Sequence, residues 1–278
     1  QGRPVLPGSR LTASSMLLEF AAQTRVQLAE AKAQAQAVEA VDDLTPSTVD
    51  PGSDESDWDC GEDEGAAGTC AASPFSQEDT IIIFDWDDTI LPSSWMQSEG
   101  LTLDSGSRPS FEQAAQLRSL ARCAARTLQS AKRFGHVVLV TNAERGWIEL
   151  SCHKFMPGLA PLLEGLKIVS ARSSYERLGV ASPVEWKCRA FQSECSSFFR
   201  LAGTERRRNV VSLGDSLNER SALFCVTKDM QNCCTKSLKF MEQPDVVQLQ
   251  REHELLSHSI LQILGHDGNL DLRVQVSP

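Results

Sequence analysis

Five short apolar segments follow residue 79, and each is followed by a longer segment with a helical pattern. The apolar segments are residues 81–84, 137–140, 166–169, 210–213 and 238–241; the helical segments are residues 111–132, 145–155, 184–200, 218–228 and 245–264. This alternation predicts an α/β fold with a parallel sheet and right-handed crossovers. Chemistry in such folds gathers at the carboxyl ends of the strands. The residues that follow each apolar segment are therefore the candidates for a functional site.

Composition divides the chain into three expected parts. Residues 1–40 include a stretch rich in Ala, Gln, Leu and Glu, which predicts a solvated helix; a helix that docks on a partner protein is the alternative. Residues 41–79 belong to an acidic stretch without Lys or Arg, in which twelve Asp and Glu fall between residues 41 and 80. Such a stretch buries too little apolar surface to fold, so we expect a disordered linker. Residues 80–278 are the predicted folded domain.

Charge and cysteine content exclude several classes of protein. The formal net charge of −10 argues against nucleic acid as the main partner, and no apolar run approaches the ~18 residues of a membrane span. The nine cysteines form no CxxC pair and no zinc-finger spacing with His. Unpaired cysteines favour a reducing compartment, either the cytoplasm or the nucleus. Because the chain begins with Gln, we expect a fragment or processed product, from which a targeting segment could have been lost.

The first apolar segment leads into the sequence Asp85-Trp86-Asp87-Asp88-Thr89. Acids at i and i+2 of an extended chain lie on the same side, which directs Asp85 and Asp87 toward one pocket. Of two neighbouring carboxylates, one can remain an ionised nucleophile while the other holds a proton as an acid. An acidic turn or a calcium loop is the alternative, although an EF-hand loop would need Gly where this chain has Ile90.

Polar residues also follow the second segment and open the helix after the third. Thr141 and Asn142 offer a hydroxyl and amides that suit a phosphoryl oxygen, and a helix cap is the alternative. Lys187 would offset phosphate charge, although a single Lys on a helix is usually a surface residue.

The fourth segment runs into Gly214-Asp215-Ser216-Leu217-Asn218-Glu219. Gly214 permits a sharp turn, while Asp215 and Glu219 offer the oxygen ligands that Mg²⁺ prefers. A capped helix start explains Asp215 nearly as well. The four motifs together, each in order at its own predicted strand end or helix start, are far more specific than any one of them.

With these motifs the chain resembles the haloacid dehalogenase superfamily of phosphohydrolases, whose first motif is DxDxT, over about residues 80–241. The resemblance implies a Rossmann-like three-layer α/β/α fold with strand order 3-2-1-4-5. It implies that Asp85 is the nucleophile that forms an aspartyl-phosphate and that Asp87 is the general acid and base. The implied phosphate-binding residues are Thr141, Asn142 and Lys187, and the implied Mg²⁺ ligands are Asp85, Asp87, Asp215 and Glu219. Trp86 is bulkier than expected beside a nucleophile.

The implied activity is that of a phosphatase or phosphomutase, because dehalogenases lack an acid at the position of Asp87. Residues 90–109 are too few for an independent cap domain, so we expect an open site and a large substrate such as a phosphoprotein. Two alternatives remain: a catalytically silent binding or regulatory protein on the same scaffold, and transfer of phosphate to an acceptor other than water. Trp95, Met96, Trp147 and Phe155 are interpreted as packing residues, with lining of the mouth of the site as the alternative, and no histidine is assigned a role.

Overall fold

The computed structural model describes residues 74–203 and 205–274. The predicted helical segment 1–40 and the linker up to residue 73 lie outside the described residues. The described part begins before the predicted boundary at residue 80, because Phe75 is buried and residues Gln77–Asp79 form the short 3-10 helix η1. The last residues of the predicted linker therefore belong to the folded domain.

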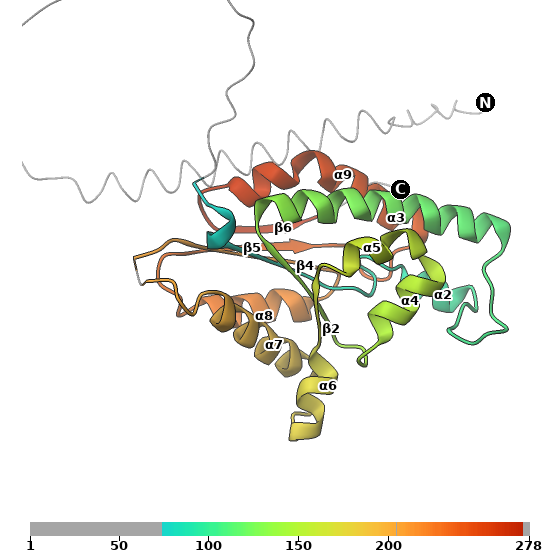
Figure 1. Ribbon diagram of the computed structural model, residues 1–278, viewed down its shortest axis with the longest axis horizontal. Helices are drawn as coiled ribbons and strands as arrows, with labels where there is room; N and C mark the ends of the chain where they lie inside the picture. Colours follow the sequence, from blue (N-terminus) through green and yellow to red (C-terminus); the bar gives the residue numbers. More distant parts are fainter. Residues whose placement is uncertain (1–73, 204, 275–278) are drawn as a thin grey trace, which may run out of the picture.

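Six parallel strands form one sheet in the order β3-β2-β1-β4-β5-β6 (Figure 1). They are β1 (Thr80–Phe84), β2 (His136–Thr141), β3 (Lys167–Ser170), β4 (Arg208–Gly214), β5 (Cys233–Lys239) and β6 (Leu270–Arg273). The α/β class is as predicted, but the five-stranded order 3-2-1-4-5 is incomplete, because β6 adds a sixth strand beside β5. Only Leu270 and Leu272 of β6 are apolar and buried, so its sequence offers too weak a pattern for prediction.

The fifth strand lies earlier in the chain than predicted. The apolar segment 238–241 overlaps β5 only at Leu238 and Lys239. The earlier residues of β5 carry no large apolar side chain, yet Lys236 is fully buried, and its Nζ donates a hydrogen bond to the carbonyl of Leu264 at 2.7 Å. Burial also lowers the pKa of Lys236 to about 7, so the core position holds less charge than an ordinary lysine would bring, which hydropathy alone does not predict.

Helices cover both faces of the sheet (Figure 1). The α-helices in the described residues are α2 (Ser93–Ser98), α3 (Phe111–Phe134), α4 (Trp147–Phe155), α5 (Ala160–Leu163), α6 (Ala171–Tyr175), α7 (Pro183–Phe198), α8 (Leu217–Thr227) and α9 (Val246–Gly265), with further 3-10 turns at η2 (Pro157–Leu159) and η3 (Glu176–Leu178). Helices α3 and α9 pack together on one face, and α7 and α8 pack together on the other. The stretch 90–109 holds only the six-residue helix α2.

The core consists of two apolar layers, one on each face of the sheet. Along β1, Ile82 and Phe84 belong to the layer beneath α3 and α9, whereas Ile81 and Ile83 belong to the layer beneath α7 and α8. All four side chains are fully buried. A strand buried on both faces reads as a continuous apolar run. This is why the sequence of β1 predicts a central strand so clearly.

The seven cysteines in the described part of the chain are all free thiols. Cys60 and Cys70 lie outside it. None of the helices in residues 74–203 and 205–274 is long and apolar enough to cross a membrane.

His253 gives the fold an expected sensitivity to acid. Its ring is fully buried in α9, Nε2 lies 2.8 Å from the carbonyl of Thr89, and burial lowers its pKa from 6.5 to about 4. Below pH 6.5 the unfolded chain takes up a proton that the folded chain accepts only near pH 4. Stability should therefore fall as the pH drops through this window, by up to about 3 kcal/mol.

Urea unfolding of the wild type and of His253→Gln at pH 7 and pH 4.5 measures this effect. The loss of stability between the two pH values should be smaller in His253→Gln. The control His258→Gln changes an exposed histidine of the same helix, and its loss of stability between the two pH values should equal that of the wild type. An equal loss in all three proteins would contradict the prediction.

Candidate active site

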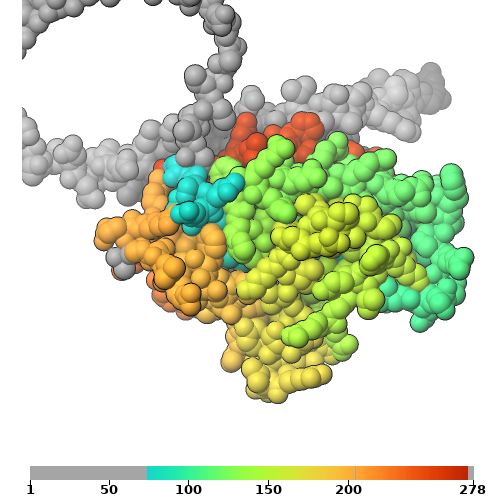
Figure 2. Space-filling model, viewed as in Figure 1, coloured from blue at the N-terminus to red at the C-terminus, as the bar shows by residue number. Residues whose placement is uncertain are grey.

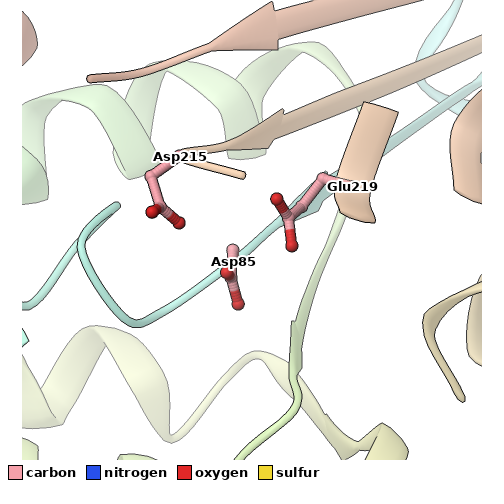
Figure 3. A group of neighbouring side chains, drawn as sticks. All are labelled: Asp85, Asp215 and Glu219. Carbon is pink, nitrogen blue, oxygen red and sulfur yellow. The ribbon is translucent and has the colours of Figure 1, made fainter. Parts of the chain in front are cut away.

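The candidate site lies at the carboxyl ends of three neighbouring strands. β1 lies between β2 and β4 and pairs with both, so Asp85 follows the central strand of the three. Thr141 ends β2, and Asp215 directly follows β4. Asp85, Asp215 and Glu219 point toward one another, and each offers a carboxylate oxygen within 4.8 Å of those of the other two (Figure 3). The structure therefore brings the first and fourth motifs together.

Lys187 lies at the centre of the site rather than on the surface. Its side chain is 1% exposed, and its Nζ lies 2.8 Å from Oδ2 of Asp85. The same Nζ also forms an ion pair with Oε1 of Glu219. A buried ammonium group requires such partners. The third motif is thus in direct contact with the first and the fourth.

The turn from β4 into α8 holds the Glu219 side chain in place. Oε2 of Glu219 accepts hydrogen bonds from the backbone N–H of Ser216 at 2.9 Å and from its hydroxyl at 2.6 Å. A Cβ on Gly214 would lie 2.2 Å from Cγ of Glu219, so only glycine permits this approach. Both oxygens of Glu219 already have donors. Glu219 therefore acts in this structure as the clamp that orients Lys187.

Asp87 is held by two hydrogen bonds on the opposite side of the site. Its Oδ1 accepts from the indole Nε1 of Trp147 at 2.8 Å, and its Oδ2 accepts from the hydroxyl of Thr141 at 3.1 Å. Burial raises the pKa of Asp87, and both hydrogen bonds oppose this rise. Trp147 is a site residue that the sequence analysis interpreted as packing. The only signal in the sequence is its position at the start of the helix after β2.

The side chain of Asn142 links two elements of the site. Its Nδ2 donates a hydrogen bond to the carbonyl of Pro183 at 3.1 Å, which joins the end of β2 to the start of α7. Helix α7 carries Lys187, and Oδ1 of Asn142 is buried without a partner among the described residues. Thr141 contributes twice, because its hydroxyl also accepts a hydrogen bond from the backbone N–H of Ala143 at 2.9 Å.

The loop after β1 explains the bulky residue within the first motif. The Trp86 side chain is fully buried in the core, and its Nε1 donates to the hydroxyl of Ser151 at 3.0 Å. It therefore points away from the two aspartates beside it. Asp88 has a left-handed backbone with φ of 51°, and its Oδ1 accepts from the backbone N–H of Ser94 in α2 at 2.8 Å. Asp88 thus fixes the loop on α2.

The electrostatics of the cluster favour a bound cation. Burial raises the pKa of Asp85 well above its usual value, and Lys187 opposes this rise. Burial, together with the nearby Glu219 and Asp88, raises the pKa of Asp215 to about 7. The carboxylates are thus crowded in a site of low polarity, with a single lysine to balance them. A divalent cation would offset the excess negative charge.

One buried carboxylate oxygen of the site has no hydrogen-bond partner among the described residues. This atom is Oδ1 of Asp85, and an oxygen of the Asp85 carboxylate lies within 4.8 Å of one of Asp215. A buried, unpaired carboxylate oxygen is costly unless something binds it. These oxygens fit a hard divalent cation such as Mg²⁺, although they do not select it over others. Among the described residues, this is the one group of three or more acidic, His or Cys side chains with such geometry.

The fold and the site together define an α/β protein with a lysine-linked acidic cluster at the carboxyl edge of a parallel sheet. Comparisons with protein-family models, with curated proteins and with solved structures find no match for this chain.

Proposed function

We propose that this chain is a Mg²⁺-dependent phosphohydrolase of the haloacid dehalogenase type that forms an aspartyl-phosphate on Asp85. One observation carries the proposal: the buried Asp85 carboxylate has one oxygen paired with Lys187 and the other free, within a cluster of further acids. A structural ion pair would be expected to satisfy both oxygens. A nucleophile needs one oxygen available.

In the first step, the free Oδ1 of Asp85 attacks phosphorus, and the bond to the leaving oxygen breaks. Asp87 gives its proton to that oxygen, so the leaving group departs as a neutral alcohol. Lys187 and the hydroxyl of Thr141 stabilise the phosphoryl oxygens. In the second step, Asp87 accepts a proton from water, which attacks phosphorus and releases phosphate from Asp85.

The proposed metal ligands are Asp85, Asp215 and the backbone carbonyl of Asp87, with Glu219 acting through water or by orienting the other groups. A bound Mg²⁺ would supply positive charge that lets an anionic carboxylate approach an anionic phosphate. The fit rests on the proximity of the carboxylates of Asp85, Asp215 and Glu219, each with an oxygen within 4.8 Å of the other two, and on the raised pKa of Asp215. The short stretch 90–109 supports a large substrate, such as a phosphoprotein, because it contains too little chain to enclose a small one.

Metal dependence is the first test of this proposal. The wild-type chain should release phosphate from an aryl phosphate in Mg²⁺, and EDTA should reduce the rate by about 100-fold or more, since the metal supplies several kcal/mol of charge stabilisation. Adding excess Mg²⁺ should restore the rate. A folded chain that binds Mg²⁺ but releases no phosphate would favour the alternative of a catalytically silent binding protein.

A further inference from the structure

Two pockets beside the site share part of their lining. The first, of about 400 Å³, lies at the carboxyl ends of β2 and β3 and includes Thr141. The second, of about 370 Å³, lies between α4, α5 and β3. Glu149 and Ile168 line both pockets, so the two adjoin along α4 and β3, and we call them together the α4–β3 groove. It begins at the site, because Thr141 donates a hydrogen bond to Asp87.

The groove has an apolar floor and an acidic rim. Leu163 and Leu166 line the second pocket, while the exposed carboxylates of Glu149 and Glu164 stand at its rim. Neither carboxylate has an ion-pair or hydrogen-bond partner within the described residues. By contrast, Glu176 in the neighbouring η3 is paired with an arginine four residues earlier. The first pocket also has Arg145 in its lining, whereas no Lys or Arg among the described residues lines the second, so the unpaired negative charge lies beside the apolar residues of the second pocket.

The position of the groove favours an extended chain as its occupant. β3 is an edge strand of the sheet, paired only with β2 among the described strands. Extended peptides bind along sheet edges, where the backbone supplies affinity and side-chain pockets supply specificity. Helices α4 and α5 form part of the molecular surface in Figure 2, in yellow-green.

We propose that the α4–β3 groove binds the peptide that carries the phosphorylated residue, with a basic side chain at Glu149 and Glu164 and an apolar side chain over Leu163 and Leu166. This inference rests on the proposed phosphohydrolase function and names its substrate class as an extended phosphopeptide with basic and apolar flanking residues. The phosphate occupies the site at Asp85, and the flanking chain follows the groove away from Thr141.

Binding of synthetic peptides tests this assignment without requiring turnover. Three fluorescein-labelled phosphoserine peptides differ only in the residues on either side of phosphoserine. The Lys peptide has Leu and Lys there, the Glu peptide has Leu and Glu, and the third peptide has only Ala. Their affinities for the Asp85→Asn chain are measured by fluorescence anisotropy at low and at high salt. The Lys peptide should bind about tenfold more tightly than the Glu peptide at low salt. This ratio of affinities should fall at high salt, because salt screens exposed charge pairs.

The double variant Glu149→Gln/Glu164→Gln, made on the same background, should lose most of this preference. The matched control Glu205→Gln, which changes an exposed residue in the loop before β4, should keep it. In chains with Asp85 intact, Glu205→Gln should hydrolyse an aryl phosphate with unchanged kcat/KM, since Glu205 lies outside both the site and the groove. The Lys peptide should also be hydrolysed with a higher kcat/KM than a sugar phosphate.

Equal affinity for the Lys and Glu peptides would overturn the inference, as would an unchanged preference in the double variant. A higher kcat/KM for the sugar phosphate than for the Lys peptide would indicate a small substrate. That result would overturn the peptide assignment and remain consistent with the proposed phosphohydrolase function. Failure of the proposed function has a different signature, in which the wild-type chain does not hydrolyse aryl phosphate in Mg²⁺.

Discussion

Asp85→Asn is expected to abolish phosphate release from an aryl phosphate, with a fall in kcat of about 10³-fold or more, as is typical when a nucleophile is removed. An amide cannot form an acyl-phosphate under these conditions, so no other residue of the site replaces this function. Continuous measurement of phosphate release in Mg²⁺, for the wild type and the variant at equal concentration, gives the ratio. Activity that survives in Asp85→Asn would show that the nucleophile lies elsewhere.

The same variant separates loss of chemistry from loss of fold. Asparagine keeps the size of Asp85 and an oxygen that accepts a hydrogen bond from Lys187, while Glu219 continues to balance the lysine charge. The free energy of unfolding should therefore change by about 1 kcal/mol or less. A near-native urea midpoint together with lost turnover assigns the effect to chemistry. A large drop in the midpoint would leave Asp85 as a structural residue.

A trapping experiment identifies the intermediate directly. Acid quenching of the wild-type chain during turnover should yield protein heavier by one phosphoryl group, with the added mass on the peptide that contains Asp85. Asp87→Asn should increase the trapped fraction with an aryl phosphate, because this leaving group needs little protonation while the attacking water still needs a base.

Much of the site could be predicted from the sequence because parallel strands bring their carboxyl ends to one edge. Asp85, Thr141 and Asp215 each follow or end an apolar segment, so their proximity follows from the α/β topology alone. Lys187 was predicted from its place at a helix start, and the structure adds that its ammonium group is fully buried between two carboxylates. Sequence could not show this, because burial depends on how α7 and α8 pack.

The features that sequence missed depend on single long-range contacts. The indole of Trp147 reaches Asp87 across sixty residues of chain, and no local pattern distinguishes it from a packing tryptophan. Strand β5 was misplaced because its buried Lys236 reads as polar, although a helix carbonyl satisfies it. Glu219 was predicted as a metal ligand and lies in the acidic group that could hold a metal, and the structure adds that its two oxygens also accept from Lys187 and Ser216.

Lys187→Met is expected to destabilise the fold by about 3–5 kcal/mol, which is the usual cost of removing one partner from a buried ion pair. Methionine fills a similar volume, so the change leaves little cavity. It does leave Asp85 and Glu219 buried at short range without a cation between them. Urea unfolding in EDTA measures the loss without any contribution from a bound metal.

Two further variants decide whether this loss comes from buried charge. Lys228→Met removes a lysine that is 65% exposed and paired with the exposed Asp229, and it should cost about 1 kcal/mol or less. Lys187→Met/Glu219→Gln removes one of the two repelling carboxylates and should recover part of the stability lost in Lys187→Met. If Lys187→Met were no more costly than Lys228→Met, the lysine would not hold the two acids together. If the second change brought no recovery, the loss would come from packing around the side chain rather than from uncompensated charge.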